Sequence, residues 1–341
     1  MRREWAGAVE VEVDAEGPVR ALAYPALTGR PEPGDRVLLN TTALALGLGT
    51  GGYAFVVAIP QRLPPDPALP GHLVKARYTP LQAIVAGAEE QHEVLAAADS
   101  LDGMPVVIAD LHSALPAVLA GLRAGRPAAR AVYVMTDGGA LPGWFSMTAA
   151  GLREAGWLAG TVTAGQAFGG DLEAVTLHTG LLAARHVLGA EVAVVAQGPG
   201  NLGTGTRWGF SGVACGEAVN AVAVLGGRPV ASLRVSEADR RPRHHGVSHH
   251  SLTAYGRVAL AGADVVLPGL PGSFGEQVAA QAAALSGRHT LVRVPVAGLL
   301  DALRGCPVPL STMGRGLAED PAAFLAAAAA GRHAAGLLDA L

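Results

Sequence analysis

The chain has few lysines and few cysteines. Lys75 is the single lysine among 25 basic residues, and the two cysteines, Cys215 and Cys306, lack paired CxxC spacing. This spacing argues against a disulfide scaffold and against a thiolate zinc site. A lone lysine in an arginine-rich chain suggests a position that requires a compact or deprotonatable cation.

Strong net charge and long apolar runs are also missing. The chain holds 25 basic and 28 acidic residues, a formal net charge of −3. Such a balance gives no global attraction to nucleic acid or anionic lipid, so anion binding needs a local cluster. No apolar run reaches the roughly 18 to 20 residues of a membrane-spanning helix, and the start at Met1 lacks the apolar core of a signal peptide. We therefore expect a cytoplasmic protein with neither nucleic-acid nor membrane partners.

The first sixty residues alternate between apolar and polar residues with the two-residue period of half-buried strands. The alternation covers Val9–Val13, Val19–Tyr24, Val37–Leu39 and Tyr53–Ile59, with turn signals such as Glu16-Gly17-Pro18 between the runs. This pattern predicts a small N-terminal antiparallel β-barrel or sandwich over residues 1–62. The proline-rich segment Pro60–Pro70 is typical of an extended linker, and residues 63–103 are expected to connect to the next domain.

From residue 104 to 341 the pattern changes to apolar strand, glycine-rich or polar loop, and amphipathic helix. This alternation predicts an α/β domain, best a mainly parallel doubly wound sheet, with a C-terminal helix over 320–341. A βα-barrel is the alternative, because the segment Leu73–Tyr78 could supply an eighth strand. The predicted strands are Val106–Ala109, Ala131–Met135, Gly160–Ala164, Val192–Ala196, Pro229–Val235, Asp264–Leu267 and Thr290–Val294. The predicted helices between and after them span 113–124, 147–156, 171–188, 213–225, 249–261, 273–286 and 296–304.

Most of the unusual polar and glycine-rich segments follow the carboxyl end of a predicted strand. In both parallel architectures ligands bind at that edge, since free N–H groups of helix N-termini converge there. We therefore expect a binding site at the carboxyl edge. The segments span 110–113, 136–139, 165–171, 198–206, 236–250 and 268–276.

The segment 239–253 combines three arginines with four histidines. Ser248 is the predicted N-cap of a helix, which would put His249 and His250 in the first turn, where the helix dipole disfavours protonation. Neutral imidazoles there could act as hydrogen-bond donors, general bases or metal ligands. His249 and His250 are adjacent and are not expected to point the same way. Arg240 and Arg243 are candidates for binding phosphate or carboxylate, together with Ser248.

The loop Gly198–Thr206 contains the spacing Gly198-x-Gly200-x-x-Gly203 after an apolar strand. This is the spacing of a dinucleotide-binding loop, but Pro199 interrupts it and no periodic helix follows directly. We expect instead that the loop's backbone N–H groups bind another anion, assisted by the hydroxyls of Thr204 and Thr206.

Several isolated residues are further candidates. Asp137 ends a strand before two glycines and is suited to moving a proton, whereas Asp171 is also a natural helix N-cap. Lys75 and Arg77 are two positions apart on a predicted strand and should point the same way, toward a ligand or solvent. The candidate metal ligands are Asp110, His112 and Asp171, although an Asp-x-His pair alone is weak evidence.

Taken together, seven blocks of the sequence resemble a bacterial protein family known only as a domain of unknown function. The resemblance covers nearly the whole chain and implies no activity, cofactor or catalytic residue. The blocks span 38–42, 75–82, 99–105, 135–142, 168–175, 246–250 and 311–316.

Three functions remain open from the residues. The first is an enzyme or binder of a small anionic molecule, possible reactions being hydrolysis or group transfer, with Asp137, His244 and His249 as candidate proton-transfer groups. The second is a non-catalytic regulatory or assembly protein whose N-terminal domain binds a macromolecule. The third is a metal-dependent hydrolase. The residues specify no cofactor and leave open whether the chain forms a homo-oligomer.

Overall fold

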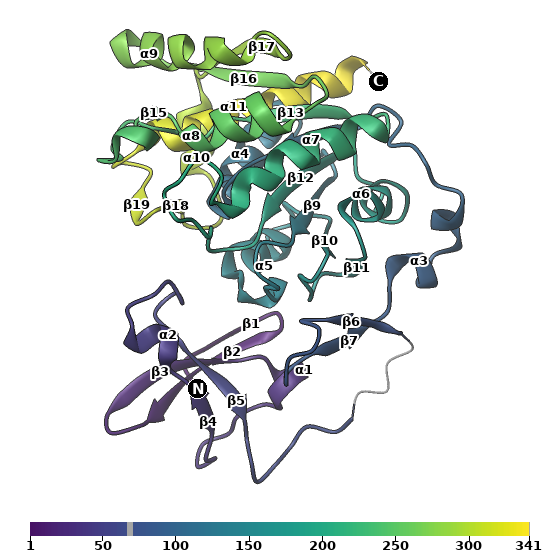
Figure 1. Ribbon diagram of the computed structural model, residues 1–341, viewed down its shortest axis with the longest axis vertical. Coiled ribbons are helices and arrows are strands. Elements are labelled where there is room, and N and C mark those ends of the chain that lie inside the picture. The colour runs from purple at the N-terminus through teal and green to yellow at the C-terminus, as the bar shows by residue number, and fades with distance from the viewer. Residues whose placement is uncertain (67–70, 341) are drawn as a thin grey trace.

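Two sheets organise the protein (Figure 1). The computed structural model describes residues 1–66 and 71–340. The last four residues of the expected linker Pro60–Pro70 therefore lie outside the described residues. Within the described residues, no helix is long and apolar enough to cross a membrane.

The N-terminal sheet has five strands in the order β1-β2-β3-β5-β4. The predicted turn at Glu16-Gly17 joins β2 to β3 as an antiparallel pair, but β3 and β5 run parallel. The sheet is therefore mixed and open, not the antiparallel barrel or sandwich that the alternation predicted. The reason is the connection: a tight turn forces neighbouring strands to be antiparallel, whereas the long segment between β3 and β5 lets the chain cross over. Its elements are β1 Arg3–Trp5, β2 Ala8–Asp14, β3 Pro18–Ala23, α1 Pro25–Thr28, β4 Leu38–Asn40, α2 Thr42–Ala45 and β5 Ala54–Ala58.

A short hairpin and a helix connect the two sheets. Strand β6 (Leu73–Lys75) pairs antiparallel with β7 (Ala83–Val85), and α3 (Ala88–Gln91) follows. Leu73–Tyr78 is thus part of a separate hairpin and does not join the parallel sheet. The βα-barrel alternative is wrong, because the strand it needed for closure lies elsewhere.

The second sheet is parallel and open, with eight strands in the order β11-β10-β9-β12-β8-β13-β16-β17. All seven predicted strands are present, and the α/β class is confirmed. The sequence pattern does not predict β11, because its three residues lie inside the predicted helix 171–188. The helix begins only after Thr176, whose hydroxyl accepts a hydrogen bond from the N–H of Thr179. The strands are β8 Pro105–Ile108, β9 Ala131–Thr136, β10 Gly160–Ala164, β11 Leu172–Ala174, β12 Val192–Gln197, β13 Arg228–Ser232, β16 Asp264–Gly269 and β17 Thr290–Pro295.

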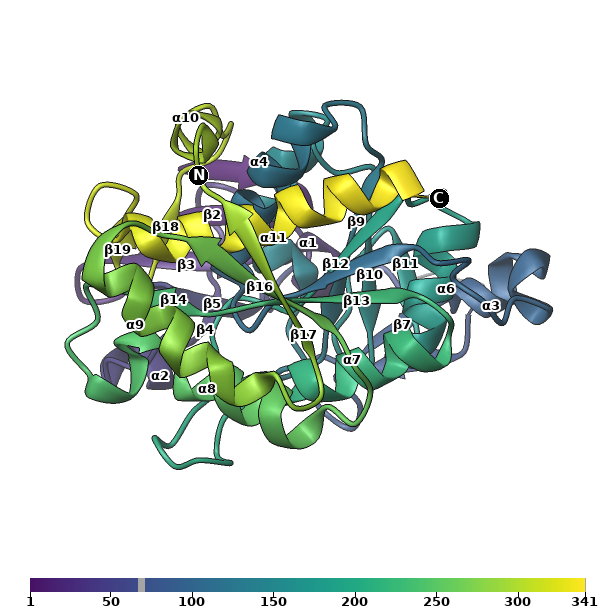
Figure 2. The same cartoon turned by 90° about the horizontal axis from the view of Figure 1, so that it is seen from above.

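Helices cover both faces of the parallel sheet, as the continuous apolar strands predict (Figure 2). One face carries α4 Leu115–Gly125, α5 Met147–Glu154, α10 Leu299–Arg304 and α11 Pro321–Leu337. The other face carries α6 Leu177–His186, α7 Ala214–Val224, α8 His249–Thr253 and α9 Gly272–Ala282. Two small pairs, β14 Val235–Ser236 with β15 Gly246–Val247 and β18 Ser311–Thr312 with β19 Arg315–Gly316, shape the loops.

The two sheets meet at the loop after β9. The indole N–H of Trp5 donates to the carbonyl of Trp144 at 2.6 Å. Gly7, with φ of 81°, lies so close to the Trp144 ring that an added Cβ would be 2.2 Å from it. The N-terminal sheet is therefore anchored beside the carboxyl end of β9.

The chain changes direction around β8. After β8 it passes to β9 on one side, and after β13 it passes to β16 on the other, although β8 and β13 are neighbours in the sheet. Ligands of doubly wound proteins bind in the crevice that such a switch point leaves at the carboxyl ends of the strands. The loops after β8 and β13 are therefore where a site is expected.

Candidate functional site

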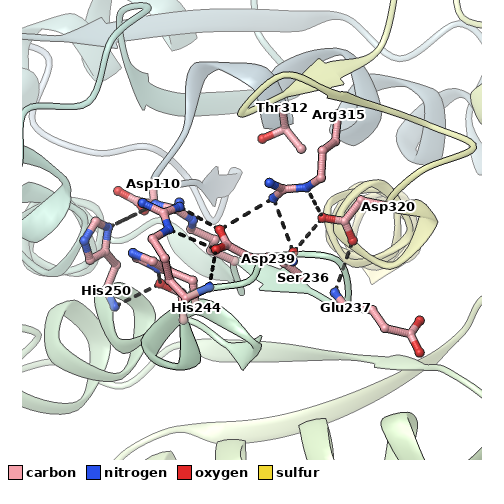
Figure 3. A network of polar contacts seen from close by, with 12 residues as sticks. Asp110, Ser236, Glu237, Asp239, His244, His250, Thr312, Arg315 and Asp320 are labelled. Atoms are coloured by element: carbon pink, nitrogen blue, oxygen red, sulfur yellow. Dashed lines mark hydrogen bonds and ion pairs between the residues drawn. The ribbon is translucent and has the colours of Figure 1, made fainter. Parts of the chain in front are cut away.

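A buried carboxylate lies at this switch point. Asp110, two residues beyond β8, is 5% exposed and accepts a hydrogen bond from Arg234 at 3.1 Å. The other oxygen of Asp110 accepts a hydrogen bond from the side-chain amide of Asn201 at 2.8 Å. Nδ1 of His250 lies 3.0 Å from the oxygen that Arg234 contacts, and Figure 3 shows Asp110 beside His250. Side chains from two loops and from one helix thus converge on one carboxyl group.

The surroundings of Asp110 keep it ionised. Burial alone would raise the pKa of this carboxyl, but the hydrogen bond from His250 and the charge of Arg234 outweigh burial and lower it. Because the carboxylate accepts hydrogen bonds only, Nδ1 of His250 carries the hydrogen that points at Asp110. The contact between Arg234 and the same Nδ1, at 3.1 Å, is then a packing contact between two donors.

A cavity of about 520 Å³ opens beside Asp110. Residues of the segments 110–113, 197–205, 234–250 and 309–313 contribute to its lining. We call it the carboxyl-edge cavity. Of the predicted site residues, it brings together Asp110, His112, Gly198, Gly200, Gly203, Arg243 and His244.

Two other predicted binding residues lie near the cavity without lining it. Thr204 makes a hydroxyl contact with Thr206 at 3.1 Å inside its own loop. Arg240 lines a more open neighbouring pocket of about 480 Å³, together with Arg241 and Arg315. The neighbouring pocket shares Arg241 with the carboxyl-edge cavity. Arg240 is therefore placed to contact only a ligand that extends beyond the cavity.

The glycine-rich loop after β12 does not have the dinucleotide-binding geometry. Gly200 adopts a φ of 96°, and the following helix α7 begins only at Ala214. Asn201 and Ser211 close the loop through a hydrogen bond of 2.7 Å. The guanidinium of Arg243 lies next to Gly205, 3.5 Å from where a Cβ on that glycine would stand. The loop and Arg243 therefore form adjoining parts of the cavity wall.

Three of the four histidines of segment 239–253 form a compact cluster. Ser248 is the predicted N-cap of α8: its hydroxyl accepts from the N–H of His250 at 3.2 Å and contacts Nδ1 of His244 at 2.8 Å. One nitrogen from each of His244, His249 and His250 lies within 4.8 Å of the others. The turn at Pro242–His244 brings the His244 ring 5.0 Å from each of the rings of His249 and His250, which differ in orientation by 67°.

Two of the clustered imidazoles, those of His244 and His249, are held neutral. Burial lowers the pKa of His244 to about 3, and the nearby charges of Arg234 and Arg241 act in the same direction. Burial also lowers the pKa of His249, with His250 and Arg243 contributing. Burial, more than the dipole of the short helix α8, therefore keeps their nitrogen lone pairs available at neutral pH.

His112 lines the cavity with both ring nitrogens already engaged. Nδ1 lies 3.0 Å from the hydroxyl of Tyr133, and Nε2 lies 2.7 Å from the hydroxyl of Ser146. Burial lowers its pKa to about 4. Neither nitrogen is free for a metal ion in this arrangement, so the predicted ligand set Asp110, His112 and Asp171 does not assemble.

The predicted acids Asp137 and Asp171 do not line the carboxyl-edge cavity. Asp137 accepts hydrogen bonds from three backbone N–H groups, including that of Ala140 at 2.8 Å, which shapes the turn after β9. Asp171 accepts from the N–H and hydroxyl of Thr161 and pairs with Arg153 at 2.9 Å. It is not a helix N-cap, because α6 begins six residues later, at Leu177, with Thr176 as its N-cap. Hydrogen bonds from nearby backbone N–H groups therefore give both carboxylates a structural role.

Lys75 and Arg77 also lie away from the cavity and do not point the same way. Ala76 adopts a positive φ of 47°, so the strand ends at Lys75 and the alternation of side chains is lost. Lys75, 2% exposed, donates to the carbonyls of Ala167 and Ala174 and lies 3.6 Å from Glu173. Burial lowers the pKa of its ammonium group. Lys75 thus ties the β6–β7 hairpin to the parallel sheet, whereas Arg77 is exposed.

A second polar network fixes the segment that carries the histidines (Figure 3). Asp320, fully buried before α11, accepts from the Ser236 hydroxyl at 2.6 Å and from Arg315 at 3.0 Å. Asp239 accepts from the guanidinium of Arg241, and this contact lowers the pKa of the carboxyl well below its usual range. Arg315, in the sequence block 311–316, therefore helps to hold the arginine- and histidine-rich segment 239–253 in place.

Sequence reasoning missed three residues that organise the site: Arg234, Asn201 and Arg315. The apolar pattern places Arg234 in the predicted strand Pro229–Val235, although β13 ends at Ser232. The available signal was a charged residue at the carboxyl end of an apolar strand, beside the loops already singled out. Arg315 offered no such signal, because its role depends on contacts with residues 76 or more positions earlier in the chain.

The fold and the cavity define an α/β protein with a candidate small-molecule site at the carboxyl edge of a doubly wound parallel sheet. Residues 20–331 match the family model described as protein of unknown function DUF3866. The chain belongs to this family. No curated protein and no solved structure matches the chain.

Proposed function

We propose that the carboxyl-edge cavity binds a small molecule bearing a phosphate or carboxylate group. The observation that carries this proposal is the environment of Arg243. Within the described part of the chain, Arg234 and Arg241 each pair with a carboxylate, whereas no ion pair engages Arg243. Its guanidinium borders the cavity beside Gly205 and offers a planar set of donors for an anion.

The adjoining glycine-rich loop offers backbone donors. Gly200 and Asn201 line the cavity, and their N–H groups donate to no acceptor among residues 1–66 and 71–340. A positive φ at Gly200 gives the local backbone the concave form that typically binds anions. Backbone N–H groups and one guanidinium in adjoining parts of the wall of a cavity of this size suit a small molecule with a single anionic group.

Whether the bound molecule reacts depends on the neighbouring histidines. His244 lines the cavity and His249 adjoins it, and both are held neutral by burial. A pKa of about 3 makes His244 a weak base at neutral pH, so proton transfer in hydrolysis or group transfer would fall to His249. Asp137, outside the cavity, has no part in this proposal. We also propose a cytoplasmic location and no nucleic-acid partner, because the net charge of −3 gives no attraction to a polyanion.

The test is a ligand screen on the full chain by thermal shift, followed by calorimetry of hits. The panel contains inorganic phosphate, phosphorylated metabolites and small carboxylates. A ligand present at about 100 times its dissociation constant should add roughly 2.7 kcal/mol of stability. Arg243→Ala should weaken its binding about 10- to 100-fold, the value of a hydrogen-bonded charge pair.

Arg36→Ala is the matched control, because Arg36 is exposed and lies in the N-terminal part of the chain. It should leave the affinity unchanged. Equal affinity of the Arg243→Ala variant would reject the assigned site. No binding by any member of the panel, together with capture of a constant macromolecular partner, would favour the non-catalytic assembly function instead.

A further inference from the structure

We propose that His244, His249 and His250 bind a divalent transition-metal ion, of which zinc is the best match. One nitrogen from each ring lies within 4.8 Å of the other two. Tetrahedral coordination by three imidazoles needs nitrogens somewhat closer than this, so small side-chain rotations complete the site. The proposal goes beyond anion binding, because it assigns a metal to residues beside the anion site.

The hydrogen bonds of two rings select the nitrogens that would face the metal. Nδ1 of His250 is directed at Asp110, and Nδ1 of His244 contacts the hydroxyl of Ser248. Nε2 of both rings takes no hydrogen bond from any described residue. A metal-ligating histidine has this arrangement, with one nitrogen on a carboxylate or hydroxyl and the other left for the ion.

The third ring supplies an independent observation. Nε2 of His249 is buried and has no hydrogen-bond partner among the described residues. Buried polar atoms are nearly always paired, because leaving one unpaired costs about 1 to 3 kcal/mol. A metal ion within reach of the other two rings would satisfy this nitrogen.

The contacts around His250 fix its ring in the way that the ring of a metal-ligating histidine is fixed. Asp110, itself held by Arg234 at 3.1 Å, fixes the tautomer of the ring. Phe210 stacks on the His250 ring with centroids 3.7 Å apart and an interplanar angle of 7°, which fixes its orientation. Asp110 thus acts as a positioning residue for the metal ligand.

The ligand set also indicates the class of metal and of site. Three imidazoles favour zinc, copper, iron or nickel over calcium and magnesium, which prefer oxygen ligands. Structural zinc sites use four protein ligands, whereas a set of three leaves a position open. Since His244 and His250 line the carboxyl-edge cavity, that position would open toward the bound molecule. This gives the metal-dependent hydrolase hypothesis a defined ligand set.

The experiment uses untagged full-length protein stripped with a chelator, in buffer without added phosphate or carboxylate. Zinc binding is followed by calorimetry, and Co²⁺ is added separately as a spectroscopic probe. The expected results are one Zn²⁺ per chain and visible Co²⁺ absorption of the intensity typical of four- or five-coordinate sites. His249→Ala should lose both, and Asp110→Asn should weaken Zn²⁺ binding about 10- to 100-fold.

His178→Ala is the control, because this histidine is exposed on α6. Circular dichroism of the metal-free variants shows whether each remains folded. A folded His249→Ala protein that binds Zn²⁺ and Co²⁺ like the parent overturns the proposal, as does a parent protein that binds neither. Because no anion is present, these outcomes are independent of the Arg243 test of anion binding.

Discussion

The carboxylate of Asp110 lies 3.0 Å from Nδ1 of His250, although 140 positions separate the two residues in the sequence. Asp110 lies two residues beyond the central strand β8, and His250 lies in the first turn of the short helix α8. Their contact joins the loop of the switch point to the histidine cluster. It thereby connects the proposed anion site and the proposed metal site within one cavity wall.

Removing the Asp110 carboxylate should destabilise the protein strongly. Asp110→Ala leaves the guanidinium of Arg234, whose side chain is 11% exposed, without its counter-charge. Breaking a buried pair in this way costs about 3 to 5 kcal/mol of unfolding free energy. Urea denaturation measures the loss. Asp301→Ala removes an 80% exposed partner of Arg304 and should cost under about 1 kcal/mol; equal losses would show that the buried pair contributes no special stability.

Adding a methyl group at Gly212 should disturb Asp110. A Cβ at this position would lie 1.7 Å from Oδ1 of Asp110, so the carboxylate or the backbone must move. Gly212→Ala should lower stability by about 1 to 3 kcal/mol and weaken Zn²⁺ binding. Gly287→Ala, where a Cβ would have no atom within 4 Å, serves as the control. Denaturation and Zn²⁺ titration of both variants check the prediction, which parent-like behaviour of Gly212→Ala would contradict.

Stability should fall between neutral and mildly acidic pH. Burial lowers the pKa of His112 from 6.5 to about 4 in the folded state. Between these pH values the unfolded chain binds more protons than the folded chain. The contribution of His112 to the free energy of unfolding is therefore complete above pH 6.5 and is lost as the pH falls toward 4. At pH 5 the loss is about 2 kcal/mol for this residue.

Urea denaturation at pH 7 and pH 5 measures the effect of His112. His112→Gln should reduce the difference between the two pH values by about 2 kcal/mol, because the titrating group is gone. His178→Gln, at an exposed position, should leave the difference as in the parent. An unchanged difference in the His112→Gln protein would assign the pH dependence to other groups, of which His244 is the first candidate.

Two glycines of helix α11 should respond in opposite ways to alanine. A Cβ on Gly331 would lie 1.9 Å from the carbonyl oxygen of Val118, at the crossing with α4. Gly331→Ala should therefore separate the helices and cost about 1 to 3 kcal/mol or more. Gly336 has no atom within 4 Å of such a Cβ, and Gly336→Ala should gain up to about 1 kcal/mol of helix propensity. Thermal unfolding should give a lower midpoint for Gly331→Ala and a higher midpoint for Gly336→Ala than for the parent protein. A Gly331→Ala protein as stable as the parent would contradict the close crossing of α11 and α4.

Local patterns were sufficient for most of the parallel sheet. Runs such as Val106–Ala109 are apolar on both faces because both faces are buried, and this property is visible in the sequence. Turn residues likewise located the β2–β3 hairpin. The patterns failed at β11, whose three residues carry too little periodicity to distinguish a strand from the start of a helix.

The candidate site could be predicted in position but not in composition. The glycine loop and the histidine-rich segment were found because their residue types are unusual at strand ends. Lys75, Asp137 and Asp171 are equally unusual, yet backbone carbonyl or N–H groups nearby engage them. A single sequence does not reveal whether a polar side chain meets a cavity or its own backbone.

The sequence by itself determined the α/β class, the buried strands and the edge where the loops gather, because hydrophobic periodicity and turn chemistry are local properties. Only the tertiary structure decided which side chains share that edge. Arg234 reaches Asp110 across 124 positions, and His244 joins His249 and His250 through a turn that the sequence did not specify. Such contacts depend on strand order and loop paths, which arise from the packing of the whole chain.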